Sequence, residues 1–227
     1  MATSGTSAFN LDLTEIAEEC FERCGAELRS GYDLRTARRS LNLLLTEWSN
    51  RGLNLWALEQ GIIPLVAGTA TYVLPADTVD LLEHVTRTGS GASQQDINLT
   101  RISVSTYSTI PNKNATGRPL QIYVQRLVTP QVTVWPVPDA STPYTLVYWR
   151  LRRLQDAGNG GANTQDVPFR FLPALIAGLA YYLSMKLPGA LERMPALKAQ
   201  YDEAWDLASS EDRDRSAVRF VPRMFGV

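Results

Sequence analysis

Two segments near the start of the chain carry apolar residues at helical spacing. In the first, Asp12 can cap a helix, and Glu15 three residues later completes the pattern of a capping box. The dipeptide Ser30-Gly31 is expected to end this helix. The predicted apolar face consists of Leu13, Ile16, Ala17, Cys20, Cys24 and Leu28.

A second helical segment follows directly. Asp33 can cap it, and Gly52 is expected to close it. Two amphipathic helices with a short turn between them predict an antiparallel pair, which needs a further apolar partner to bury both faces. The apolar face of the second helix consists of Leu34, Ala37, Leu41, Leu44, Leu45 and Trp48.

Between about residues 55 and 155 the helical spacing gives way to short stretches rich in Val, Ile, Thr, Tyr and Trp, which favour strands. Residues 62–65 and 69–74 flank Ala67-Gly68 and predict a hairpin, while residues 102–110 are ambiguous, with a short helix as one interpretation. Other strands are expected at residues 79–87, 120–127, 131–135 and 144–152. The prolines around them favour edge strands and loops: Pro130, Pro136, Pro138 and Pro143.

Helical spacing returns from Pro168 to about Leu187 and again from Ala190 to Ser210, with Pro195 as a candidate start of the last helix. We therefore predict an α+β fold: a helical bundle built from both ends of the chain, an inserted antiparallel β domain and an extended C-terminal tail. The expected parts are a flexible N-terminal arm (1–10), the helical bundle (11–54 and 166–213), the β domain (55–165) and a C-terminal docking tail (214–227).

Composition allows a packed core, because 44% of the 227 residues are hydrophobic and 20% are charged. The formal net charge is −1, whereas a dedicated nucleic-acid binder usually carries a basic excess. DNA near this protein is therefore expected to pass without being bound tightly. Residues 1–10 lack a signal-peptide pattern, and no apolar run reaches the roughly 20 residues of a membrane span. We expect a protein made in the cytoplasm without membrane contact.

Residue types that commonly carry catalysis or bind metals are scarce. Cys20 and Cys24 lie one helical turn apart on an apolar face and are expected in the core, and with one histidine they are too few for a zinc site. That histidine, His84, falls in a predicted strand, where we expect it to be solvated or hydrogen-bonded. We predict no catalytic, cofactor or metal site, although a pair of carboxylates assembled in space stays open. The acidic cluster of the first helix is assigned to its solvated face: Glu15, Glu18, Glu19 and Glu22.

Two arginine clusters are candidates for contacts. Arg150 and Arg152 share one face at the end of a predicted strand, and Arg153 lies on the other. The second cluster lies beside the apolar face of the second helix, where it is either solvated or turned toward a neighbouring subunit or a channel. Its members are Arg35, Arg38 and Arg39.

The last twelve residues carry apolar side chains that are unusual at an exposed terminus. Such a segment either folds back onto its own core or docks in the groove of a partner, and we favour docking. The two phenylalanines would be the anchors. The predicted docking residues are Arg219, Phe220, Val221, Pro222, Arg223, Met224 and Phe225.

Four stretches of the chain resemble the head-to-tail adaptor proteins of tailed, mainly short-tailed, bacteriophages. Residues 41–53 combine a helix with a Trp-x-x-x-Gly ending, and residues 59–61 and 72–75 follow them. Together the stretches span roughly residues 10–210. The others, in order, are residues 110–113 with 117–119, 134–139 with 144–149, and 166–168 with 174–180.

The resemblance implies a non-enzymatic virion protein at the head-tail junction. It implies a homo-oligomeric ring, expected to be dodecameric, between the portal protein and a tail or nozzle protein. A C-terminal segment would reach toward the portal, and genomic DNA would pass through the channel without sequence-specific binding. Two alternatives stay open: a tail-associated cell-wall hydrolase, and another tail component that contacts the host receptor.

Overall fold

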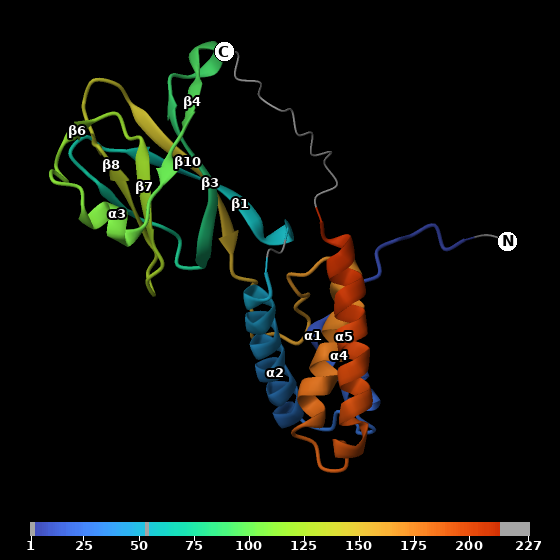
Figure 1. Ribbon diagram of the computed structural model, residues 1–227. Coiled ribbons are helices and arrows are strands. Elements are labelled where there is room, and N and C mark those ends of the chain that lie inside the picture. The colour runs from blue at the N-terminus through green and yellow to red at the C-terminus, as the bar shows by residue number, and fades with distance from the viewer. Residues whose placement is uncertain (1–2, 53–54, 214–227) are drawn as a thin grey trace, which may run out of the picture. The chain divides into compact units, whose positions relative to one another are not determined.

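The computed structural model describes residues 3–52 and 55–213 (Figure 1), so the predicted docking tail lies outside the described residues. The chain divides into two compact units, which are residues 1–47 with 156–227 and residues 48–155. Helices and antiparallel sheets are both present, and the predicted α+β class is confirmed. The helices are α1 (Leu13–Arg23), α2 (Gly31–Asn50), α3 (Val104–Ser108), α4 (Leu172–Ser184) and α5 (Met194–Glu211).

The strands all belong to residues 48–155, here called the β unit. They are β1 (Leu58–Leu65), β2 (Thr71–Val73), β3 (Thr78–Thr88), β4 (Gln95–Asn98), β5 (Thr100–Arg101), β6 (Thr116–Gly117), β7 (Gln121–Gln125), β8 (Gln131–Trp135), β9 (Val137–Pro138) and β10 (Tyr144–Arg152). One sheet has the order β1-β10-β3-β4, a second has β2-β8-β7-β5, and β6 pairs with β9. The pairs are antiparallel except β5 with β7 and β6 with β9.

The core of the β unit combines apolar residues from both four-stranded sheets, because alternate side chains of each strand point to the same face. Leu81 on β3 and Leu146 on β10 meet Ile122 on β7 and Val134 on β8. The two sheets therefore pack face to face around one core. Its other buried members are Leu74, Leu99, Val132 and Tyr148.

The predicted hairpin around Ala67-Gly68 is wrong. The turn exists, with the amide of Thr69 donating to the carbonyl of Val66 over 3.0 Å. The two strands that it joins, however, enter different sheets, since β1 pairs with β10 and β2 pairs with β8. Strand pairing with distant segments has overridden the local pairing.

The expectation of edge strands beside the prolines is also wrong for β8 and β10, which are interior strands of their sheets. Pro130, Pro136 and Pro143 lie just outside these strands, where a missing N–H costs no ladder hydrogen bond. Pro64 does lie inside a strand, and that strand, β1, is at a sheet edge.

The predicted start of α1 is confirmed. The amide of Glu15 donates to Oδ1 of Asp12 over 2.9 Å, and the amide of Asp12 donates to Oε2 of Glu15 over 3.0 Å. This reciprocal pair is a capping box, which satisfies two backbone donors at the helix terminus.

The predicted end of α1 is wrong, because the helix ends at Arg23 and Leu28 lies beyond it. Gly25 has φ +77°, a conformation that favours glycine. Its amide donates to the carbonyl of Glu22, and the amide of Ala26 donates to the carbonyl of Phe21 over 2.9 Å. These two bonds form a Schellman motif that ends the helix before the predicted stop.

The start of α2 also differs from the prediction. The helix begins at Gly31, with Asp33 in its first turn rather than at its cap. The hydroxyl of Ser30 accepts a hydrogen bond from the amide of Asp33 (3.3 Å), while Oδ2 of Asp33 accepts one from the amide of Ser30 (3.1 Å). Ser30 therefore does the capping, and Asp33 completes the reciprocal pair.

The unit formed by residues 1–47 and 156–227 is here called the helical unit. Helix α4 is its central element, since the side chains of α4 are buried on nearly every face. Against α1, the thiol of Cys20 donates to the carbonyl of Ile176 and that of Cys24 to the carbonyl of Ala180, each over 3.3 Å. Both cysteines are free and buried, as predicted. Burial raises the pKa of the Cys20 thiol, so this group stays a neutral donor.

The two other helices approach α4 at one glycine. A Cβ on Gly178 would lie 2.8 Å from Cε2 of Tyr201 on α5 and 3.0 Å from Cδ2 of Leu44 on α2. Further along, the hydroxyl of Tyr182 donates to the Glu47 carboxylate. Helices α2, α4 and α5 therefore meet where α4 has no side chain.

His84 on β3 is buried, with a relative exposure of 8%, and neither ring nitrogen makes a hydrogen bond of ordinary geometry to a described residue. The expectation of a solvated or hydrogen-bonded histidine is thus wrong. Burial, and after it the charge of Arg101, lowers the pKa of His84 from its ordinary 6.5, although the carboxylates of Glu83 and Asp80 and the backbone of Leu99 oppose the shift.

We expect Gly178→Ala to lower the free energy of unfolding by about 1–3 kcal/mol, because the added methyl would displace Tyr201 or Leu44 in a filled core. Chemical denaturation measures this. Gly31→Ala is the matched control: its Cβ would meet nothing within 4 Å, so stability should be unchanged or slightly raised. Equal stability of the two variants would contradict the close approach.

His84 should make stability depend on pH. Below its ordinary pKa of 6.5 the unfolded chain binds a proton that the native chain refuses. The free energy of unfolding should therefore fall as pH drops through about 6.5, and level off below the native pKa. Denaturation between about pH 7.5 and about pH 5 checks this, with NMR of the single histidine. An unchanged slope in His84→Leu would contradict the assignment.

Candidate interaction surfaces

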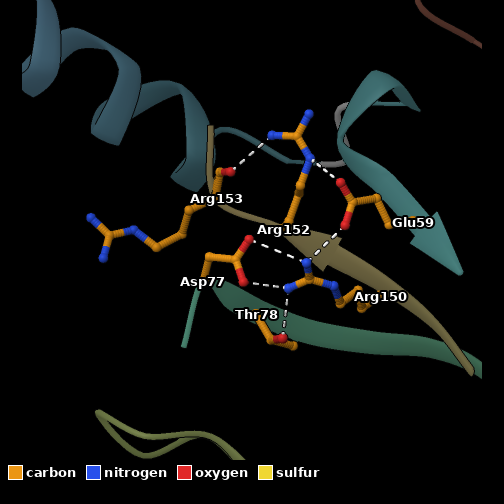
Figure 2. Close-up of polar contacts among 6 residues, drawn as sticks. All are labelled: Glu59, Asp77, Thr78, Arg150, Arg152 and Arg153. Carbon is orange, nitrogen blue, oxygen red and sulfur yellow. Dashed lines mark hydrogen bonds and ion pairs between the residues drawn. The ribbon is translucent and has the colours of Figure 1, made fainter. Parts of the chain in front are cut away.

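An arginine–carboxylate cluster joins three segments of the β unit (Figure 2). Arg150 on β10 pairs with Asp77 over 2.5 Å and with Glu59 on β1 over 2.7 Å, and it donates to the hydroxyl of Thr78 over 3.0 Å. Arg152 pairs through Nε with the other oxygen of Glu59 over 2.8 Å. As predicted, Arg150 and Arg152 lie on one face, since both reach the same carboxylate.

The cluster is electrically balanced, with two arginines facing two carboxylates. The arginine side chains are only 10% exposed, whereas Glu59 and Asp77 are about half-exposed. The hydrogen bond from Arg150 lowers the pKa of Asp77. Burial alone would lower the pKa of Arg150, but its bonds to Asp77 and Glu59 outweigh this and raise it. These arginines tie strands together and are already neutralised, so they offer little charge to DNA.

The candidate contact residues of α2 lie on one helix face, at positions three and four apart. Arg35 and Arg39 are exposed and Arg38 is half-buried. Nη1 of Arg38 donates to Oδ1 of Asn159 over 3.1 Å, and Nε of Arg35 donates to the carbonyl of Gly31 over 3.3 Å. Neither bond neutralises a charge, because both acceptors are neutral carbonyl oxygens.

An apolar groove of about 1030 Å³ runs between α1, α4 and the segment before α1 in the helical unit. Its floor contains Phe169, Leu172, Pro173 and Ile176, which come from the start of α4 and the turn before it. Glu15, Glu18, Glu19, Glu22 and Arg23 of α1 form its rim, and Ser7, Phe9 and Leu11 of the segment before α1 complete the lining. We call it the α1–α4 groove.

A smaller hollow of about 470 Å³ continues on the other side of α4. It shares Arg23 and Pro173 with the α1–α4 groove and adds Glu203 and Leu207 from α5. The side chain of Leu207 is 65% exposed. The apolar surface of the helical unit therefore extends over both sides of the N-terminal part of α4.

Sequence reasoning missed the α1–α4 groove, although it placed the four glutamates correctly on a solvated face. Glu18 and Glu22 are exposed, as expected. The floor beneath them comes from residues about 150 positions later in the chain, which no local pattern of α1 reveals. One signal was present: Phe169 and Pro173 are apolar residues at the start of a helix, and both stay exposed.

Over the part of the chain that the structure describes, no three His, Cys, Asp or Glu side chains are placed to hold a metal ion. Likewise, none of the described helices has the length and apolar character that crossing a membrane requires.

Comparison with known proteins identifies the family. The family described as SU10 adaptor protein matches residues 12–223, which is nearly the whole chain. The chain belongs to this family. The resemblance to adaptor proteins is thereby confirmed. The arginine–carboxylate cluster lies within the matched residues of this adaptor, as do the parts of the α1–α4 groove that come from α1 and α4.

The adaptor also matches a chain of the solved structure described as "Neck of empty GTA particle computed with C6 symmetry". The identity is 11%, the match covers 96% of the adaptor and 97% of that chain, and the TM-score is 0.25. A TM-score of this size carries no argument about the arrangement of the two chains. No curated protein matches the adaptor.

We expect Arg150→Met to destabilise the adaptor by about 1–2 kcal/mol, because Asp77 loses the guanidinium that it pairs with, while Glu59 keeps its pair with Arg152. Arg126→Met is the matched control, since Arg126 is 61% exposed and its ion pair with Asp80 is long, at 4.0 Å. This substitution should change stability by about 0.5 kcal/mol or less. Thermal and chemical denaturation of both variants decide this. Equal stability of the two variants would refute the structural role of the cluster.

Proposed function

We propose that this adaptor is a structural virion protein that forms a ring between the portal and the tail, and that the genome passes through the ring. The observation that carries the proposal is the family match over residues 12–223, which spans both units. The stoichiometry proposed is the dodecamer that the sequence resemblance implies. The ring would bind the portal on one side and a tail or nozzle protein on the other.

Charge distribution supports passage of DNA without binding. The chain is nearly neutral overall, and Arg150 and Arg152 are paired within the β unit. Strong binding of DNA needs many unpaired basic groups, because each phosphate contact releases counterions. In the proposed ring, Arg35, Arg38 and Arg39 would contact a neighbouring subunit or line part of the channel.

Attachment to the portal is assigned to the C-terminal segment, with Phe220 and Phe225 as anchors. Arg219 and Arg223 would pair with portal carboxylates. A single short segment binds weakly, but a ring repeats the contact once in every subunit, so avidity makes the whole attachment strong. Each contact can therefore stay small while the assembled neck remains stable.

Negative-stain imaging of purified adaptor mixed with portal tests the proposal. A ring stacked coaxially on the portal is the expected result. A monodisperse subunit that ignores the portal would overturn it, and the two alternatives would then be tested directly. Clearing of cell walls in a zymogram would favour the hydrolase, and binding to host cells would favour the receptor-contacting component.

Deletion of residues 216–227 should abolish attachment to the portal while leaving the circular dichroism unchanged, since the described helices end at Glu211. Phe220→Ala/Phe225→Ala should reproduce most of this loss. Val128→Ala, at a side chain that is 99% exposed in the β unit, is the control and should attach normally. Full attachment of the deletion variant would show that the anchor lies elsewhere.

A further inference from the structure

The described chain ends beside the α1–α4 groove. Helix α5 ends at Glu211, and the carboxylate of the next residue, Asp212, pairs with the guanidinium of Arg170. Arg170 follows Phe169, which forms part of the groove floor. The segment that continues from Arg213 therefore starts next to the groove.

The groove presents an apolar floor under an acidic rim. Phe169 on the floor is 79% exposed. On the rim, Glu19 pairs with Arg23 over 2.8 Å, but among the described residues nothing pairs with Glu18 or Glu22. An exposed aromatic floor between two unpaired carboxylates favours a ligand that is both apolar and basic.

The C-terminal segment has this composition. Residues 214–227 contain three arginines at every fourth position, against one aspartate. The arginines are Arg215, Arg219 and Arg223, and the large apolar residues between and after them are Val218, Phe220, Val221, Met224, Phe225 and Val227. The groove and the segment are therefore complementary in charge and in apolar character.

We propose that residues 214–227 occupy the α1–α4 groove of their own chain in the free subunit. An extended segment of this length reaches at most about 46 Å, and α1 is about 17 Å long, so the whole groove is within reach. A tethered segment also has an effective concentration in the millimolar range, which favours its own groove over that of a second copy. Binding shelters apolar side chains that would otherwise face water in every unassembled subunit.

This inference rests on the groove and the segment, and it is independent of the portal contact proposed above. In this proposal the groove and the portal compete for the C-terminal segment. The segment stays in the groove until the portal binds it more tightly. A variant whose groove no longer binds the segment should still attach to portals. Loss of groove binding and loss of portal attachment can therefore be told apart.

Cross-linking tests the occupant. In the full-length Arg219→Lys/Arg223→Lys variant, a zero-length carbodiimide should join the new lysines to Glu18 or Glu22, as mapped by mass spectrometry. A mixture of ¹⁴N- and ¹⁵N-labelled chains should give cross-links within single chains. Cross-links between chains would overturn the own-chain assignment, and lysines joined only to carboxylates outside the groove would overturn the site.

Proteolysis tests the energetics. Chymotrypsin should cleave after Phe220 about 10-fold more slowly in the native protein than in Glu18→Arg/Glu22→Arg or Phe169→Ala, because cleavage requires the open state. Controls with the same chemistry outside the groove are Glu83→Arg/Glu192→Arg and Leu191→Ala, which should cleave at the native rate. Because all these positions are exposed, the fold should persist, and circular dichroism verifies it. Equal cleavage rates in all five proteins would overturn the proposal.

Discussion

The helical unit depends on the close approach of three helices at Gly178. Tyr201 and Leu44 fill the space that a side chain would take, and α4 is buried on nearly all sides as a result. On the α1 side, the thiols of Cys20 and Cys24 donate to consecutive turns of α4, so even the polar atoms there are satisfied within the core. A helix with almost no polar face can be soluble only in such surroundings.

The α1–α4 groove lies at the N-terminal part of the same central helix. Where α4 begins, α1 and α5 no longer cover it completely, and Pro173 and Phe169 remain exposed. The first turn of α4 tolerates Pro173, because the N–H that proline lacks has no partner in the first turn of any helix. The apolar floor is thus the uncovered end of the central helix. Its acidic rim is the solvated face of α1, whose glutamates keep the surface soluble.

Much of the fold was predictable from local pattern, because local rules decide those parts. The capping box at Asp12 and the bounds of β8 and β10 follow from neighbouring residues. The failures involve distant partners or competing turns. β1 pairs with β10, far along the chain, so the hairpin prediction failed, and Gly25 ended α1 before Ser30. The groove was beyond local pattern for the same reason, since its rim and floor come from opposite ends of the chain.

The two charged surfaces of the adaptor differ in whether their charges are paired. The arginine–carboxylate cluster serves stability, and the rim of the α1–α4 groove is free to interact. In the arginine–carboxylate cluster, each buried guanidinium already has its carboxylate, so the charges act within the β unit. At the groove rim, Glu18 and Glu22 are exposed and lack a partner among the described residues, so their charges remain available to a ligand. Removing a charge of the arginine–carboxylate cluster should therefore lower the stability of the β unit, whereas removing Glu18 or Glu22 should alter only what the groove binds.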